Sequence, residues 1–407
     1  MYKIQSTKVM KEIMGNYFLG MKNKNKKIAW CTSVGPAELL RSFGFEVHFP
    51  ENHGALLGAT RTAGDLIPES AKFGYSNDIC SYLTADIGSY LKGETPLQEH
   101  YGLEGPPKPD LIVYNTNQCR EVQDWFTYFG RELNVPVIGI YPPRHLDEIK
   151  EEVIEDVAAQ FRKMIPVCEE VSGKKFDIDK FRETLKLSKE ATDLWKKVLY
   201  TATNTPSPIS FFDATIHMGP IVVLRGTQQA KDYYTILLKE MEENVAKGIG
   251  FLESESCRLY WDGMPIWGKL RSLSDLFIQN NAAVVASTYC NSWVFDAFDP
   301  ENPFESSAKA YTEIFINRSE NAKQNILTDL CKTFKIDGVI FHDAKTCANN
   351  SNSRFGLPQR LTESTGIPTL IIEGDLCDLR FYSEGQSITK IETFIEQITS
   401  NKVLVHK

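Results

Sequence analysis

The chain has 407 residues, a formal net charge of −8 and nine cysteines. At roughly 100–200 residues per domain, this length predicts two or three domains. A content of 42% hydrophobic and 24% charged residues is typical of a globular protein and excludes disordered, collagen-like and coiled-coil classes. The acidic balance argues against nucleic-acid binding, which normally requires a basic surface.

The first residues and the hydropathy pattern give no sign of export or membrane insertion. Residues 1–27 are rich in lysine and lack the apolar centre of a signal peptide. No run of about 18 apolar residues predicts a membrane-spanning helix. We therefore expect a cytoplasmic protein with no membrane attachment, in which the cysteines are reduced.

Short apolar, β-branched runs alternate with helical patterns at both ends of the chain. The predicted strands are 27–31, 45–49, 109–114, 135–141, 258–261, 282–289, 337–341 and 367–373. The predicted helices that connect them include 36–43, 121–133, 267–280 and 353–365. Such alternation indicates parallel sheets with right-handed crossover helices.

Between these regions, residues 146–199 and 231–247 are helix-periodic and contain no strand-like run. The sequence therefore predicts two doubly wound α/β domains of the flavodoxin or Rossmann type, at 1–145 and 251–407. A mainly helical segment, 146–250, separates them. The proline-rich stretch 205–208 is a plausible hinge within that segment.

Three cysteines lie in polar loops at predicted helix starts. Cys119 and Cys347 each follow a predicted strand, and Cys80 ends a Gly/Asn/Asp turn that leads into a helix. Ligands of open α/β sheets bind beyond the carboxyl ends of the strands, and thiols at helix N-termini are expected to have lowered pKa values. Three such thiolates could hold three irons of a [4Fe-4S] cluster and leave the fourth open. The alternative is that they are free core cysteines, which are common.

The other six cysteines give weaker signals. Cys168 and Cys331 lie in helical patterns and Cys257 begins a strand, so these three are interpreted as packing residues. Cys31 and Cys290 end predicted strands and Cys377 follows one, so these could line the site. No CxxC pair or regular spacing indicates a disulfide framework or a zinc finger.

Further candidates follow predicted strands. Glu51 could act as a general base, or simply cap a helix; Ser33 could hydrogen-bond a bound carbonyl, or cap the helix near Pro36. His53 and His342 are predicted in loops after strands, as hydrogen-bonding rather than catalytic residues. The motifs GxGxxG, GxxxxGK[ST] and HExxH are absent, so dinucleotide, nucleotide-phosphate and zincin sites have no support.

Several motifs together resemble those of the 2-hydroxyacyl-CoA dehydratase and benzoyl-CoA reductase family, over nearly the whole chain. They are Pro50-Glu51-Asn52-His53, Gly74 to Cys80, Asn115 to Cys119, Arg225-Gly226-Thr227, Lys345-Thr346-Cys347 and Asp375 to Ser383. Within the family, the chain is similar to the larger subunit, which is the α type of the dehydratases and the B type of the reductase.

The resemblance implies a cofactor and a set of site residues. It implies one [4Fe-4S] cluster bound by Cys80, Cys119 and Cys347, with Ser33 and Glu51 beside the open iron. A double-cubane [8Fe-9S] cluster in a homodimeric reductase of the family is an alternative. The implied partners are a smaller homologous β subunit, an acyl-CoA substrate and a separate ATP-hydrolysing iron–sulfur activator. A separate ATP-hydrolysing activator agrees with the absence of a phosphate-loop motif from this sequence.

The implied reaction is the radical elimination of water from an (R)-2-hydroxyacyl-CoA. One electron placed on the thioester carbonyl gives a ketyl radical, which expels the neighbouring hydroxyl and makes the β-hydrogen acidic enough for a base to remove. Two alternatives stay open. The chain could be a subunit of a benzoyl-CoA reductase, because segments 282–289 and 316–318 are closer to the B-type subunit of that enzyme. It could also be a partner whose active site lies in another subunit.

Overall fold

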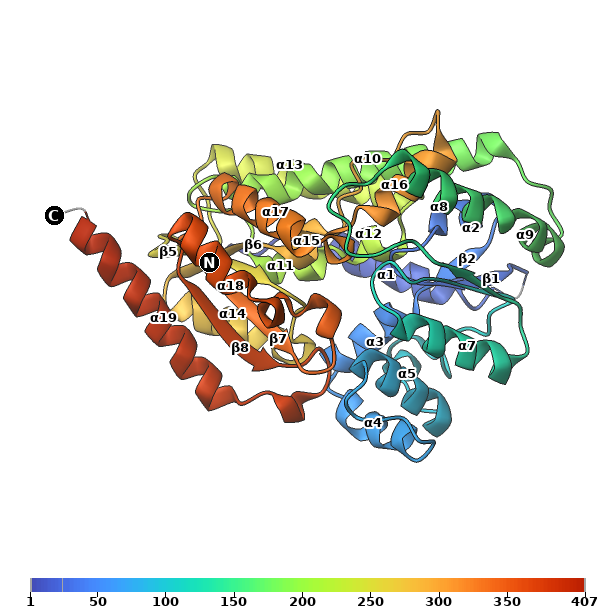
Figure 1. Cartoon of the computed structure of the whole chain (residues 1–407), viewed down its shortest axis with the longest axis horizontal. Coiled ribbons are helices and arrows are strands. Elements are labelled where there is room, and N and C mark those ends of the chain that lie inside the picture. Colours follow the sequence, from blue (N-terminus) through green and yellow to red (C-terminus); the bar gives the residue numbers. More distant parts are fainter. Residues whose placement is uncertain (1, 24, 406–407) are drawn as a thin grey trace.

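The computed structural model describes residues 2–23 and 25–405. Two four-stranded sheets form its framework, and every strand pair in them is parallel (Figure 1). The strand order is β2-β1-β3-β4 in the first sheet and β6-β5-β7-β8 in the second. The prediction of an α/β protein with two parallel-sheet domains is therefore confirmed.

The first sheet and its helices occupy the N-terminal part of the chain. The elements are α1 (Thr7–Gly20), β1 (Ile28–Cys31), α2 (Ala37–Ser42), β2 (Glu46–His48), α3 (Pro50–Ala59), α4 (Ala63–Ala71), α5 (Ser81–Lys92), α6 (Pro96–Tyr101), β3 (Leu111–Asn115), α7 (Glu121–Leu133) and β4 (Val137–Ile140).

Helices alone connect the two sheets, and Figure 1 shows α10 and α13 side by side along one edge of the molecule. The elements are α8 (Glu151–Lys163), α9 (Ile165–Ser172), α10 (Ile178–Tyr200), η1 (Thr201–Thr203), α11 (Phe211–His217), α12 (Gly219–Val223) and α13 (Gln228–Ala246). Asp177 and Thr227 cap α10 and α13 by accepting backbone N–H bonds in the first turn. The boundaries predicted for this segment, 146 and 250, stay a prediction.

The second sheet follows. The elements are β5 (Cys257–Asp262), η2 (Trp267–Lys269), α14 (Leu270–Gln279), β6 (Ala282–Ser287), α15 (Thr288–Asn291), α16 (Pro303–Thr312), η3 (Phe315–Asn317), α17 (Glu320–Thr333), β7 (Gly338–Ala344), η4 (Ala348–Asn350), η5 (Asn352–Phe355), α18 (Leu357–Thr365), β8 (Thr369–Gly374), η6 (Leu379–Phe381) and α19 (Glu384–Val405). Among the helices that the structure describes, none has the length and apolar character needed to cross a membrane.

Two hydrophobic clusters divide the core. The larger one includes Ala29 and Cys31 on one face of the first sheet and continues through the helices into the second sheet. The smaller one takes the other face, through Trp30, and packs against α3, α5 and α7. Strands β1, β3, β5 and β6 are buried along their whole length, as expected for parallel strands covered on both faces. Residue Leu376, which follows β8, joins the smaller cluster, so the two halves of the chain share it.

Several predicted positions of histidine and cysteine residues were wrong. His53 lies in α3 rather than in a loop, and His342 lies within β7, which extends to Ala344. Cys290 lies in the short helix α15, because the strand before it ends at Ser287. Helices in the first half were missed as well: between β2 and β3 the chain forms α3, α4, α5 and α6, of which the sequence predicted only the one after Cys80.

Candidate functional site

The three cysteines predicted as ligands all lie at the start of a helix. Cys80 directly precedes α5, Cys119 lies two residues before α7, and Cys347 directly precedes η4. All three pack against the smaller hydrophobic cluster. The structure therefore brings together thiols that are separated by up to 267 residues, 80 to 347, along the chain.

Exposure separates these three cysteines from the other six. Cys80, Cys119 and Cys347 are partly exposed. The remaining six are buried, and they are Cys31, Cys168, Cys257, Cys290, Cys331 and Cys377. A cofactor ligand must reach the surface of a cavity, whereas a packing residue need not. The three predicted ligands thus differ in exposure from the other six cysteines, among them Cys31, Cys290 and Cys377, which the sequence left open.

The pKa values of the three thiols differ from the prediction. Lowered values were expected at helix starts, but burial raises the pKa of Cys347 to about 12 and raises those of Cys80 and Cys119 as well. Backbone N–H groups near each sulfur act in the opposite direction and are outweighed. Negative charge on Cys80 and Cys347 also raises the pKa of Cys119, which places the three thiols close enough to interact. Metal binding here would release protons.

The donor type of this site fits an iron–sulfur cluster. Cysteine thiolates are the usual ligands of [4Fe-4S] clusters, and each thiolate binds a different iron. Cys80, Cys119 and Cys347 could therefore hold three irons of such a cluster. In the described part of the chain, no three His, Cys, Asp or Glu side chains form a group that could hold one metal ion.

Hydrogen bonds join the loops that carry the three cysteines. The N–H of Ser81 donates to Oγ1 of Thr346, at 3.0 Å, and so ties the residue after Cys80 to the residue before Cys347. The Arg144 Nη2 donates to the carbonyl of Gln118, at 3.1 Å, and to Oδ1 of Asn349, at 2.9 Å. Arg144 thus links the Cys119 loop to the Cys347 loop.

Glu51 lies beside these loops in the first turn of α3. The backbone N–H of Ser33 donates to both of its carboxylate oxygens, at 3.0 and 3.1 Å. The Gln118 Nε2 donates to Oε1 of the same carboxylate, and Gln118 directly precedes Cys119. Ser33 and Glu51 are therefore held against the Cys119 loop, and their place beside an open iron stays a prediction.

Burial controls the acidity of Glu51. The side chain is 8% exposed, and burial raises its pKa to about 7, against the opposing effect of the bonds from Ser33 and Gln118. A carboxyl with this pKa accepts and releases a proton at neutral pH, as a general base requires. Glu51 is also the acidic residue in the first turn of α3, so a role at the helix start stays open. Ser33 does not cap α2 with its side chain.

The cysteines left open by the sequence divide between the two cores. Cys31 and Cys290 belong to the larger cluster, and Cys290 lies 3.7 Å from the Thr215 hydroxyl. Cys377 belongs to the smaller cluster and its thiol donates to the carbonyl of Gly54, at 3.3 Å. Cys377 is thus the one of the three that lies near Cys80, whose charge raises its pKa. Cys168, Cys257 and Cys331 are buried in the larger cluster, consistent with packing.

Some residues at this site were missed by sequence reasoning. Gln118, Arg144, Thr346 and Asp375 all bind the cysteine loops or Glu51, yet none was assigned a role. For Gln118 and Thr346 the available signal was adjacency, since each directly precedes a predicted ligand. Arg144 gave no local signal, because its partners lie 26 and 205 residues away in the chain.

The two histidines considered as candidates, His53 and His342, are both buried. His53 bonds Asp86 through Nδ1 and Thr95 through Nε2, while the Trp125 Nε1 donates to the same aspartate, at 2.8 Å. The Nδ1 of His342 donates to the carbonyl of Met264, at 2.7 Å.

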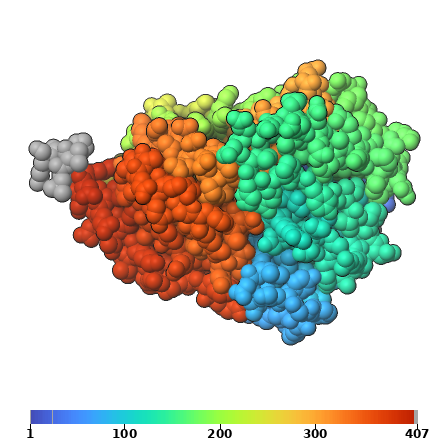
Figure 2. Space-filling view, viewed as in Figure 1, coloured from blue at the N-terminus to red at the C-terminus, as the bar shows by residue number. Residues whose placement is uncertain are grey.

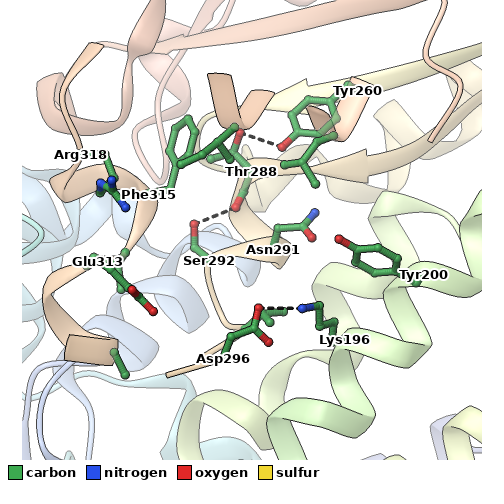
Figure 3. A pocket seen from close by; sticks show the side chains of 15 residues that line it. Lys196, Tyr200, Tyr260, Thr288, Asn291, Ser292, Asp296, Glu313, Phe315 and Arg318 are labelled. Atoms are coloured by element: carbon green, nitrogen blue, oxygen red, sulfur yellow. Dashed lines mark hydrogen bonds and ion pairs between the residues drawn. The ribbon is translucent and has the colours of Figure 1, made fainter. Parts of the chain in front are cut away.

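A separate cavity of about 250 Å³ lies between α10, α15 and η3 (Figure 3). Lys196 and Asp296 pair across it at 2.6 Å, and Tyr260 and Thr288 bond each other on its wall. None of the five predicted site residues lines it. The three-cysteine site and this cavity are therefore distinct.

Comparison with known proteins gives full-length matches. The chain is 30% identical over 388 residues to the (R)-2-hydroxyisocaproyl-CoA dehydratase alpha subunit of Clostridioides difficile, covering 94% of this chain and 93% of that one. It is 31% identical over 387 residues to the (R)-phenyllactyl-CoA dehydratase alpha subunit of Clostridium sporogenes, covering 94% and 92%. It is also 29% identical over 407 residues to the B-type subunit of benzoyl-CoA reductase from Thauera aromatica, covering 96% and 93%.

A family match spans most of the sequence. Residues 32–398 match the family described as 2-hydroxyglutaryl-CoA dehydratase, D-component. This range contains the second sheet, all strands of the first sheet except β1, and the five predicted site residues. The chain belongs to the 2-hydroxyglutaryl-CoA dehydratase D-component family.

Proposed function

We propose that this chain is the α-type, iron–sulfur subunit of an (R)-2-hydroxyacyl-CoA dehydratase. The observation that carries the proposal is the Glu51 carboxylate, bound by Ser33 and Gln118 beside the loop of Cys119. The α-subunit names of the two dehydratase relatives support it. They also support a second, β-type subunit as partner. Three thiols that could hold a [4Fe-4S] cluster and a buried base then occupy one site.

The cluster would be bound by Cys80, Cys119 and Cys347. When bound, it would supply an open iron that acts as Lewis acid and electron relay for the thioester carbonyl. We propose that the electron comes from a separate ATP-hydrolysing iron–sulfur activator and that elimination proceeds through a ketyl radical of the substrate. We propose a reducing, anaerobic cytoplasm as the place of action.

The chain's own residues would orient the substrate and move one proton. The N–H of Ser33 fixes the Glu51 carboxylate. The Ser33 hydroxyl, which also interacts with that carboxylate, would hydrogen-bond the thioester carbonyl of the bound substrate. Glu51 would remove the β-hydrogen after the hydroxyl has left. Its raised pKa, about 7, makes it a stronger base than an exposed glutamate while leaving much of it ionised at neutral pH.

The second candidate is a subunit of an ATP-dependent benzoyl-CoA-type reductase. The match to the Thauera aromatica reductase, 29% identical over 96% of this chain, favours it. The two reactions differ in electron use, because dehydration consumes no net electrons whereas ring reduction consumes two.

The test is anaerobic purification with iron and sulfide analysis, followed by assays with the partner and activator. About four irons per chain, with one spectroscopically distinct in Mössbauer spectra, are expected; about eight would indicate a double-cubane cluster instead. Water loss from a 2-hydroxyacyl-CoA without net electron consumption supports the dehydratase. Electron-coupled reduction of benzoyl-CoA supports the reductase, and an iron-free, fully active protein contradicts both.

A further inference from the structure

A buried hydrogen bond between backbone and side chain connects the two halves of the chain at the three-cysteine site. The N–H of Ser81, the first residue of α5, donates to Oγ1 of Thr346 in the loop after β7, at 3.0 Å. Both residues are buried, with exposures of 1% and 6%. In Figure 2 the blue surface around α4 and α5 meets the orange and red surface of the C-terminal half at one boundary. The bond therefore joins two regions that are remote in sequence.

Asp375 fixes the direction of this bond. It is fully buried, and one of its oxygens accepts from both the N–H and the Oγ1 of Thr346, at 2.9 and 2.6 Å. The other oxygen accepts from the N–H groups of Cys377 and Asp378, at 3.3 and 3.1 Å. The carboxylate accepts only, so the Thr346 hydroxyl must donate its single hydrogen to Asp375. A lone pair of Oγ1 then faces the Ser81 N–H.

The chain position of both partners gives this bond a consequence for the cysteines. Ser81 follows Cys80 directly, and Thr346 precedes Cys347 directly. A movement of either loop would change the distance between the two sulfurs, because each bonded residue is the immediate chain neighbour of a cysteine. A rigid cluster tolerates little variation in that distance.

We propose that Thr346, oriented by Asp375, is a positioning residue that sets the spacing of Cys80 and Cys347 and so determines how firmly the cluster is held. The inference takes from the proposed function only that a cluster is bound at this site. It predicts that loss of the Thr346 hydroxyl lowers iron retention even where the chain folds normally.

Thr192 is a matched control within the same chain. Its hydroxyl is also buried, donates to the carbonyl of Trp293, at 3.1 Å, and accepts from the N–H of Phe295, at 2.9 Å. It therefore bridges two segments, α10 and the loop after α15, in the same way as Thr346. Its partners lie in the larger cluster, which does not contain the three site cysteines.

The experiment measures the loss of iron from anaerobically prepared chains to an excess of chelator. Thr346→Val removes the hydroxyl at constant shape, and we expect it to lose iron at least tenfold faster than the wild type. Thr346→Ser keeps the hydroxyl and should lose iron at the wild-type rate. Thr192→Val should also keep the wild-type rate. Equal retention in Thr346→Val and the wild type would overturn the proposal, as would equally fast loss from Thr192→Val.

A second measurement uses the iron-free chain. Amide hydrogen exchange at Ser81 should be slow in the wild type and fast in Thr346→Val, because only Thr346 is its acceptor. Thr346→Ala, which leaves a gap in place of a buried methyl group, serves if the valine variant does not fold. Unchanged exchange at Ser81 in these variants contradicts the inference. A wild-type chain that binds no iron contradicts the proposed function instead, so the two failures are distinguishable.

Discussion

The two sheets share one strand order, yet they supply different parts of the site. In each sheet, the strand that comes first in the chain, β1 or β5, lies between the second and the third. The loop after the third strand carries a site cysteine, which is Cys119 after β3 and Cys347 after β7. Between the second and third strands, the first half holds α3 to α6, with Glu51 and Cys80, whereas the second half holds α15, α16, η3 and α17 at the equivalent place. The shared topology thus gives equivalent positions to Cys119 and Cys347, whereas the proposed base lies in a connection that differs between the halves.

A pair of buried carboxylates makes the difference clearer. Glu51 follows β2 and Asp262 ends β5, and burial raises the pKa of the first to about 7 and of the second to about 6. The oxygens of Asp262 are bound by the Thr288 hydroxyl and by Nδ2 of Asn352, both within the C-terminal half. Glu51 instead binds the Ser33 and Cys119 loops. A raised pKa alone therefore does not single out Glu51, and its contact with the Cys119 loop is what distinguishes it from Asp262.

The largest effect is expected on the iron content, from changes in the loops after β3 and β7, which carry a site cysteine in both halves. Cys119→Ala and Cys347→Ala should each reduce the iron content from about four per chain to a small fraction, because a cubane with two thiolates is labile. Cys290→Ala is the matched control, since Cys290 is buried in the larger core and should leave the iron content unchanged. Iron analysis after anaerobic purification measures both. Full iron content in Cys347→Ala would show that the Cys347 loop does not hold iron in the way proposed for the Cys119 loop.

The next effect tests the two carboxylates. Glu51→Gln should lower the turnover number about 10²- to 10⁴-fold, the usual contribution of a general base, with the iron content unchanged. Asp262→Asn should retain turnover within about twofold, because its partners lie in the C-terminal half. Steady-state kinetics with the assembled enzyme and matched iron contents measures the difference. An inactive Asp262→Asn enzyme with full iron content would show that both halves contribute to proton transfer.

Sequence patterns predicted the sheets because buried parallel strands leave a strong local signal. The strands around 28–31 and 111–115 are short, apolar and β-branched, and they appear where expected. The helices α4 and α6 were missed because both contain proline and are short, 9 and 6 residues, so their periodicity is weak. Positions within elements were less accurate: His342 was placed in a loop because the strand was expected to end at Phe341.

The residues of the candidate site that could be proposed from sequence are those with a signal in their own sequence neighbourhood. Cys80 and Cys347 stood out because each lies in a polar loop before a helix. Their hydrogen-bonded connection through Thr346 was not predictable, because it depends on docking the two halves of the chain. The acidity of the thiols was predicted with the wrong sign for a similar reason: burial, which outweighs the helix N–H groups, is a property of the folded chain.

The contrast between Glu51 and Asp262 can be tested further through the pH dependence of the free energy of unfolding. Burial raises the pKa of Asp262 from 3.8 to about 6, so the folded chain binds a proton that the unfolded chain releases between these pH values. Its contribution to stability is thus fully present below pH 4 and is lost as pH rises through 6, by about 3 kcal/mol. Asp262→Asn should remove this part of the pH dependence. Urea unfolding of both proteins at pH 4.5 and pH 7 measures it, and identical pH dependence in the two would contradict it.

The smallest expected effect concerns Gln118, through which the Cys119 loop contacts the base. Its Nε2 donates to Glu51 and stabilises the ionised carboxylate, so Gln118→Met should raise the pKa of Glu51. Since the base must be ionised to accept a proton, the acidic limb of the pH–rate profile should move to higher pH, with turnover about tenfold lower at neutral pH. Gln160→Met is the matched control, because the Gln160 carboxamide bonds Tyr141 and Asp156 instead. An unshifted acidic limb in Gln118→Met would mean that burial and Ser33 set the pKa of Glu51 without Gln118. The two halves would then differ in where their carboxylates lie rather than in how the pKa values of those carboxylates are set.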